Sequence, residues 1–297
     1  MKLVSDRAIS AAAELDIVSD FFRTYRIGVP DEQVRADLTF GNPHEMALPK
    51  LVESLKRRIE PRRVDWFAYK TSEREAQEVV ARALETELGL AFEPDDIAMT
   101  PGAFAAIGVA FSLLLDPGDE CVIPMPGWFA YTTMLRARNA VPVKVALDDR
   151  TWDLDVAAIE RAITRRTRIV IINTPHNPTG IVYSRERLSE LAEMLKRKSA
   201  ETGKPIFILS DEPYRRIRFD GVAFTSPAQL YPWTLIDYSY AKILLAPGLR
   251  LGYLAICPDM PQEARDELRK LAMSVQVSLG WAFPDALAQY AVADLEA

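Results

Sequence analysis

Residues 239–252 read Ser239-Tyr-Ala-Lys242-Ile-Leu-Leu-Ala-Pro-Gly-Leu-Arg250-Leu-Gly252, and they follow a mostly apolar run at 233–238 that predicts a buried strand. Ser239, Lys242 and Arg250 therefore fall just beyond a strand end, where open α/β sheets bind their ligands. Loss of water and the neighbouring charge of Arg250 should lower the pKa of Lys242, and a neutral lysine amine attacks aldehydes. The alternatives are a solvated Lys242 and an Arg250 held in a structural ion pair, so the interpretation depends on the other loops.

From residue 96 onward, short apolar segments alternate with longer amphipathic ones. The short segments predict strands at 97–100, 120–124, 142–146, 167–172, 205–209, 235–238 and 251–257. The longer ones predict helices at 104–115, 128–140, 155–164, 184–199, 263–273 and 281–297. Strands that are regularly separated by helices indicate an α/β fold, with a mainly parallel sheet covered by helices on both faces.

The first part of the chain is predicted to be helical, with helices at 5–27, 49–58 and 72–88. The turn Gly41-Asn-Pro43 and an aromatic loop that includes Tyr69 lie between these helices. We expect the helix at 5–27 to lie over another domain or subunit. This pattern divides the chain into an N-terminal helix and arm at 1–45 and a larger domain at 46–297.

Hydrogen-bonding groups follow the other predicted strands. Thr100-Pro-Gly102-Ala103-Phe104 is a glycine turn that runs into a helix, whose free N–H groups bind phosphate, although it is neither a Walker loop nor a dinucleotide turn. Trp128 either lies flat against an aromatic ring or packs in the core. Asn177, in the rigid stretch Asn177-Pro-Thr-Gly180, either bonds a ligand oxygen or closes an Asx turn.

The stretch Ser210-Asp211-Glu212-Pro213-Tyr214 follows a strand that should be fully buried. Asp211 is then partly desolvated and requires a cationic or donor partner. A protonated pyridine nitrogen is such a partner, because an aspartate that holds this proton lets the ring accept electron density. Tyr214 can donate to the phenolate oxygen of the same ring. The alternative is a surface ion pair for Asp211 and a half-buried Tyr214.

Composition argues against several classes of protein. The chain of 297 residues carries a net charge of −6 without a basic run, which argues against nucleic-acid partners. No apolar stretch is long enough to span a bilayer, and Cys121 and Cys257 lie in apolar runs as expected for buried free thiols, so we expect a cytoplasmic protein. With only His44 and His176 in the chain, we expect neither a histidine zinc site nor a serine triad.

The lysine, the phosphate donors and the carboxylate together suggest pyridoxal 5'-phosphate as the cofactor. The sequence resembles the class I/II aminotransferases, pyridoxal-phosphate enzymes of the aspartate aminotransferase fold (fold type I), from about residue 35 to the end. The resemblance is carried by Asn177-Pro-Thr-Gly180, by Ser210-Asp-Glu-Pro-Tyr214, and by Ser239-x-x-Lys242 followed by Arg250 and Gly252.

The resemblance implies specific roles for these residues. Lys242 forms an aldimine with the cofactor and moves the proton of the substrate Cα, while Asp211 pairs with the pyridine nitrogen. Asn177 and Tyr214 contact the phenolate oxygen and Trp128 stacks on the ring, with Gly41, Trp128 and Asn177 near the substrate. Ser239, Arg250 and the turn Gly102-Ala103-Phe104 hold the phosphate. Tyr69 reaches the phosphate of a neighbouring subunit, which implies a homodimer with shared active sites.

The sequence departs from the family pattern in two places. Ala241 stands where a hydroxyl residue often precedes the lysine, so one phosphate contact is missing. The family normally continues into a C-terminal small domain that supplies an arginine for the substrate carboxylate, and here the sequence ends first. We therefore expect a truncated form or another carboxylate anchor.

Three functions follow from these patterns. The first is an aminotransferase that moves an amino group between an L-amino acid and a 2-keto acid. The second is another pyridoxal-phosphate reaction on the same fold, by a lyase, synthase, decarboxylase or oxidase. The third is a module that binds the cofactor without turnover.

Overall fold

A sheet with the strand order β1-β7-β6-β5-β4-β2-β3 forms the centre of this computed structural model. The structure describes residues 3–39, 41–43, 45–281 and 283–296. The strands are β1 (Ile97–Thr100), β2 (Glu120–Met125), β3 (Val141–Ala146), β4 (Thr167–Asn173), β5 (Phe207–Asp211), β6 (Thr234–Ser239) and β7 (Gly252–Ile256). The predicted α/β class is confirmed.

The strand directions bring the predicted site loops to one edge. The pairs β2–β3, β2–β4, β4–β5 and β5–β6 are parallel, whereas β7 is antiparallel to both of its neighbours, β6 and β1. β7 returns beside β6 after the short segment 240–251, and a connection of this length suits an antiparallel neighbour. The carboxyl ends of β1, β2, β4, β5 and β6 therefore meet the start of β7 at one edge.

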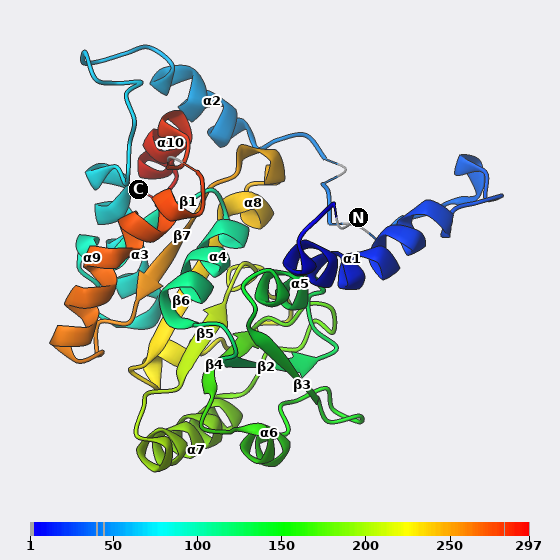
Figure 1. The fold of residues 1–297 in the computed structure, drawn as a ribbon. Helices are drawn as coiled ribbons and strands as arrows, with labels where there is room; N and C mark the ends of the chain where they lie inside the picture. The colour runs from blue at the N-terminus through cyan, green and yellow to red at the C-terminus, as the bar shows by residue number, and fades with distance from the viewer. Residues whose placement is uncertain (1–2, 40, 44, 282, 297) are drawn as a thin grey trace.

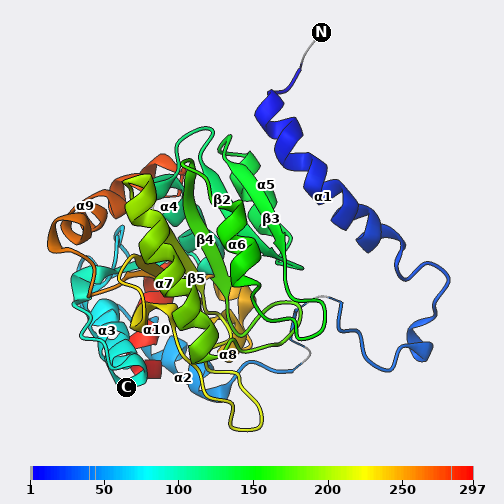
Figure 2. The same cartoon turned by 90° about the horizontal axis from the view of Figure 1, so that it is seen from below.

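Helices cover both faces of the sheet (Figures 1 and 2). On one face lie α4 (Ala103–Leu114), α5 (Ala130–Arg136) and α9 (Gln262–Ser278), which share a buried cluster with Ile171, Leu209 and Leu235. On the other face, α6 (Val156–Ala162) and α7 (Arg185–Thr202) pack on Val170 and Ile208. The helices α2 (Pro49–Arg58), α3 (Arg74–Leu88) and α10 (Ala286–Glu296) cover the β1–β7–β6 end of that second face.

Side-chain caps explain where several helices begin and end. Ser184 accepts a hydrogen bond from the N–H of Arg187 at the start of α7, and Gly203 ends this helix with a left-handed φ of 73°. Asp155 begins α6 in the same way by accepting from the N–H of Ala158. Ser72 lies outside α3, contrary to prediction, because its hydroxyl accepts the N–H of Met99 from β1.

Two further predicted helices were too long. The helix predicted at 128–140 is α5, which begins only at Ala130, because the backbone turns sharply at Gly127. It ends before Asn139, whose φ of 58° is left-handed. The helix predicted at 281–297 begins at Ala286, where Asp285 accepts the N–H of Ala288. The predicted helical residues 282 and 297 lie outside the described residues.

The N-terminal helix α1 (Asp6–Thr24) packs against α5 and has no buried residue. Glu14 anchors it through ion pairs with Arg136 and Lys144. Its neighbour is therefore the sheet domain of the same chain, where the sequence indicated only another domain or subunit. The 3-10 turn at Asp31–Gln33 follows, and in Figure 1 a long connection leads from there to α2.

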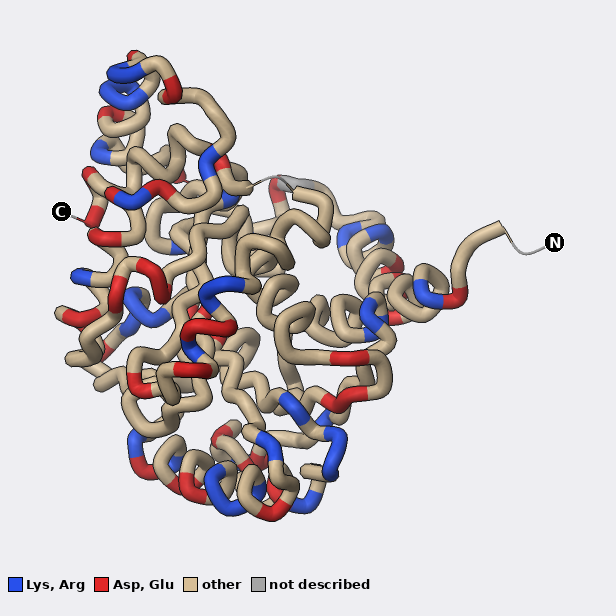
Figure 3. The backbone as a smooth tube through the Cα atoms, turned by 60° about the vertical axis from the view of Figure 1, so that its left-hand side comes forward, with Lys and Arg blue, Asp and Glu red and all other residues tan. Residues whose placement is uncertain are grey.

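Acidic and basic residues are intermixed around the outside of the molecule (Figure 3). On α7, for example, Lys196 pairs with Glu193 and Lys198 with Glu201, one helical turn apart. Within the described part of the chain, no helix is both long enough and apolar enough to cross a membrane. Cys121 and Cys257 are buried free thiols, as predicted.

Candidate active site

A cavity of about 860 Å³ opens at the sheet edge where the predicted site loops meet. Most of the residues singled out from the sequence line it: Gly41, Ala103, Phe104, Trp128, Asn177, Asp211, Tyr214, Ser239, Lys242 and Arg250. Gly102 lies directly beside Arg250 at the same end. The volume is in the range of cavities that bind small molecules and cofactors.

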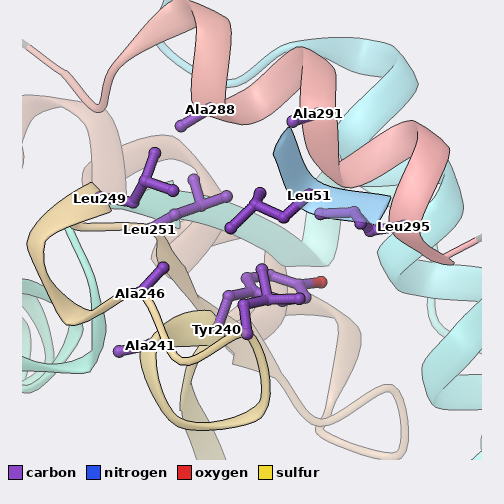
Figure 4. Close-up of a pocket in the computed structure, with 10 residues that line it drawn as sticks. Leu51, Tyr240, Ala241, Ala246, Leu249, Leu251, Ala288, Ala291 and Leu295 are labelled. Carbon is purple, nitrogen blue, oxygen red and sulfur yellow. The ribbon is translucent and has the colours of Figure 1, made fainter. Parts of the chain in front are cut away.

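Lys242 projects from the short helix α8 (Tyr240–Ile243). Ser239 caps this helix, because its hydroxyl accepts the N–H of Ala241. Figure 4 shows apolar side chains from α2 and α10 packed against this segment, with Leu51 and Leu295 on the side of Tyr240. The space left between them is only about 10 Å³, so the backbone that carries Lys242 is closely packed.

The surroundings of Lys242 lower its pKa, in the direction expected from the sequence. Burial contributes most and the charge of Arg250 adds to it, while the charge of Asp211 acts in the opposite direction. The Nζ atom lies 3.5 Å from the carbonyl oxygen of Gly41 and 5.8 Å from the ring centre of Tyr214. A larger share of this amine is therefore neutral, and nucleophilic, than for an exposed lysine.

Asp211 is the last residue of β5 and is only 5% exposed. One carboxylate oxygen accepts a hydrogen bond from the hydroxyl of Tyr131, on α5. The other oxygen, Oδ1, has no hydrogen-bond partner among the described residues. Burial raises the pKa of Asp211, while hydrogen bonds from Tyr131 and Asp237 and the charge of Lys242 oppose that rise.

Asn173, at the end of β4, joins the two polar loops beside Asp211. Its side-chain amide donates to the carbonyl oxygen of Asp211 at 2.9 Å, and its Oδ1 accepts the N–H of Asn177 at 2.6 Å. The side chain of Asn177 lies near that of Tyr214, whose pKa is raised to about 12, mainly by burial. These contacts hold an amide and a neutral phenol side by side on the cavity wall.

At the end of the cavity near α4, the backbone of Gly102 lies very close to Arg250 and to Gly252. Gly102, at the N-terminal cap of α4, has a φ of 81°, and a Cβ there would lie 3.0 Å from the guanidinium of Arg250. A Cβ on Gly252 would lie 2.8 Å from the backbone of Gly102, so both positions require glycine. Free N–H groups of the helix start and a guanidinium thus converge, which suits a phosphate.

Trp128, a predicted site residue, lies edge-on to Phe104 and Tyr131, with ring centres 4.8 and 5.2 Å apart.

Part of this site was not predicted from the sequence. The N-terminal helix α1 adds an apolar wall to the cavity that the sequence did not predict, formed by Ile17, Val18, Phe21 and Phe22. Tyr131 and Asn173 carried no signal beyond their positions in a predicted helix and at a predicted strand end. Tyr69 is 86% exposed and does not line this cavity.

Comparison with known proteins identifies the family of this chain. The family described as "Aminotransferase class I and II" matches residues 36–297. The chain belongs to this family. The predicted resemblance to this family is confirmed.

Individual relatives agree with this assignment. A probable aspartate/prephenate aminotransferase of Thermus aquaticus is 34% identical over 73% of this chain and 55% of its own length. The aspartate aminotransferase of Geobacillus stearothermophilus is 32% identical over 72% of this chain and 52% of its own length. A crystal structure of an aminotransferase from Eubacterium rectale has a TM-score of 0.89, with 29% identity, over 99% of this chain and 75% of that one. The chain thus spans about half the length of the curated relatives it matches.

Proposed function

We propose that the chain is a pyridoxal-phosphate-dependent aminotransferase that moves an amino group between an L-amino acid and a 2-keto acid, with Lys242 as the residue that bonds the cofactor. The observation that carries the proposal is the meeting of two groups in one cavity. Lys242 has a lowered pKa, and the buried Oδ1 of Asp211 has no partner among the described residues. Such a pair suits an aldehyde attached to a protonated pyridine ring.

The other residues of the cavity fit the same cofactor. A ring N–H would satisfy Asp211, and the phenol of Tyr214 with the amide of Asn177 would hold the ring's phenolate oxygen. Trp128 would cover the ring. Ser239, Arg250 and the turn Gly102-Ala103-Phe104 would bind the phosphate through a hydroxyl, a guanidinium and backbone N–H groups.

The proposed chemistry divides between cofactor and chain. When bound, pyridoxal phosphate supplies an aldehyde that takes up amino groups and a ring that accepts the electron pair left at the amino acid's Cα. With the cofactor bound, Lys242 would be the group that takes the proton from the amino acid's Cα and passes it on. Its lowered pKa increases the share of the neutral amine, which is the form able to accept that proton. An ionised Asp211 would hold the protonated ring nitrogen.

The substrates are proposed by class, as an L-amino acid and a 2-keto acid. Several relatives are named as aspartate or aspartate/prephenate aminotransferases, so L-aspartate and prephenate are the first compounds to test. Gly41, Trp128 and Asn177 line the cavity where the substrate would lie.

We further propose a cytoplasmic homodimer with shared active sites. The position of Tyr69 supports the sharing of active sites between two subunits. Its side chain is exposed and lies outside the cavity of its own chain, as expected of a residue that contacts the cofactor of a neighbouring subunit. The free thiols of Cys121 and Cys257 agree with a reducing compartment. We also retain the division into an arm at 1–45 and a cofactor domain at 46–297.

The proposal is tested by mixing purified protein with pyridoxal phosphate and then adding single L-amino acids, L-aspartate first. We expect saturable visible absorbance of the bound cofactor, and then one keto acid released for each cofactor that gains an amino group. Lys242→Ala should abolish both signals, whereas Lys270→Ala, at an exposed position on α9, should leave them unchanged.

Other outcomes separate the alternatives. Loss of carbon dioxide or ammonia, without an aminated cofactor, would indicate a different pyridoxal-phosphate reaction. Binding that no amino acid perturbs would indicate a module without turnover. Absence of saturable binding would refute all three.

A further inference from the structure

A second buried carboxyl group lies beside Asp211. Asp237 is on β6 and is directly opposite Asp211 in the parallel pairing of β5 with β6. Both side chains point to the face covered by α4 and α5, since Leu209 and Leu235, two residues earlier in each strand, pack there. Asp237 is fully buried, with an exposure of 0%. This pair was not predicted from the sequence, because Asp237 stands inside a run that is otherwise mostly apolar.

Among the described residues, nothing around Asp237 stabilises a negative charge. Neither of its oxygens has a hydrogen-bond partner among them, and the neighbouring charge that acts most strongly on its pKa is the carboxylate of Asp211. The helix α4, which packs over β6, has no titratable side chain. Glu212 adds a further negative charge nearby. An ionised Asp237 would thus be buried without compensation.

Asp211 is the better placed of the two to carry the charge. It accepts a hydrogen bond from Tyr131, and Lys242 lies close enough to stabilise a negative charge on it. Burial and the charge of Asp211 raise the pKa of Asp237 well above its usual range. Two carboxylates this close do not both ionise, so one proton remains in the pair and the asymmetry places it on Asp237.

We propose that Asp237 is a positioning residue that stays protonated and donates its hydroxyl to Asp211. Asp211 then receives two donors, the hydroxyl of Tyr131 and that of Asp237. This arrangement keeps Asp211 ionised and oriented for the ring nitrogen of the cofactor. The second half of the inference rests on the proposed function, whereas the protonation of Asp237 does not.

The experiment compares wild type with Asp237→Asn, which keeps a donor of the same shape, and Asp237→Leu, which does not. Infrared spectra at neutral pH, recorded without added cofactor, report the C=O stretch of a protonated carboxyl group. We expect this band in wild type and its loss in both variants. A wild-type spectrum without the band, or a band that persists in both variants, would overturn the proposal whatever the cofactor result.

Titration with pyridoxal phosphate between pH 6 and 9 tests the positioning role. We expect Asp237→Asn to bind within about threefold of wild type, and Asp237→Leu to bind about tenfold or more weakly, the loss expected for one hydrogen bond to a charged group. As the pH is lowered, Asp237→Leu should also begin to lose affinity for the cofactor at a higher pH than wild type does. The reason is that Asp211 has lost a donor and takes up a proton more easily.

Each outcome of the titration decides one point. Equal affinities and equal pH profiles for the Asn and Leu variants would show that donation plays no part, and would overturn the positioning role. If Asp237→Leu fails to fold, the pH profile of cofactor affinity in Asp237→Asn decides instead. Removing an ionised carboxylate at position 237 would shift this profile relative to wild type, whereas removing a neutral carboxyl group would not. Wild-type protein that binds no cofactor would refute the proposed function and the positioning role together, and the infrared band would still decide the protonation.

Discussion

Arg250 acts on the site in two ways, through its own donors and through its effect on Lys242. Its guanidinium contacts the carbonyl oxygens of Pro101 and Pro247, at 3.3 and 2.9 Å, which holds it at the phosphate end of the cavity. Its charge also lowers the pKa of Lys242, second only to burial.

The variant Arg250→Gln should weaken both effects. We expect binding of pyridoxal phosphate to weaken by about tenfold or more, because a charged two-pronged donor is lost. The pH midpoint for the covalent adduct with Lys242 should rise, since its amine is then protonated up to higher pH. Absorbance titrations across pH measure both quantities, with Arg82→Gln, at an exposed position on α3, as the control. An unchanged midpoint would contradict this view of Lys242.

His176 provides a pH test of stability. It is 5% exposed beside Thr179, and burial lowers its pKa to about 4 from 6.5. As pH falls below about 6.5, the unfolded chain binds a proton that folded His176 does not, so stability declines down to about pH 4, by about 3 kcal/mol at most. Above pH 6.5 both states are neutral and His176 has no effect.

The variant His176→Gln should remove this part of the pH dependence. Denaturant unfolding at pH 7.5, 6 and 5 should therefore show wild type losing more stability than the variant as pH falls. The carboxylate groups titrate in both proteins, so the difference between the two isolates His176. Parallel curves would show that His176 is protonated equally in the folded and unfolded chains.

At the scale of elements, a buried charge cluster joins the turn before β1 to α9. Asp96 is fully buried and accepts hydrogen bonds from Arg265 at 2.7 Å and Arg269 at 2.8 Å, and it also accepts the N–H of Glu93. Removing one partner of such a cluster leaves uncompensated buried charge.

Asp96→Ala should therefore lower the free energy of unfolding by about 3–5 kcal/mol. The neighbouring Asp95 is the matched control, because its side chain is 63% exposed and its ion-pair partner among the described residues is the exposed Arg74, so Asp95→Ala should cost less than about 1 kcal/mol. Urea unfolding at neutral pH measures both. Similar losses for the two variants would argue that the buried cluster contributes no more than a surface pair.

The order and the packing of the strands and helices explain which parts of the site could be predicted from the sequence. Lys242 and Asn177 follow parallel strands, and carboxyl ends of parallel strands share one edge, so the pattern of strands and helices placed them together. Tyr131 and Asp237 depend on how a helix is rotated and on which residues pair across strands, which periodicity does not fix. The antiparallel β7 and the contact of α1 with the cavity arise from packing between segments far apart in the sequence. The strand and helix alternation was therefore readable, and the partners of Asp211 were not.

At the scale of the whole molecule, the proposed role of Tyr69 would connect the site with a dimer. If it serves a neighbour's phosphate, light scattering should give the mass of a dimer at micromolar concentration. Tyr69→Phe should then weaken pyridoxal phosphate binding by about tenfold, as for one hydrogen bond to an anion, without changing that mass. A monomer that binds the cofactor as tightly as a dimer would contradict the shared site.

In the proposed function, one amine in this chain, that of Lys242, takes up the cofactor. The most direct test is to mix the protein with one equivalent of pyridoxal phosphate at pH 8, reduce the adduct with borohydride and map the modified peptide by mass spectrometry. We expect a single modified residue, Lys242, and no comparable adduct in Lys242→Ala. Labelling spread over surface lysines, or equal labelling of the Lys242→Ala variant, would contradict it.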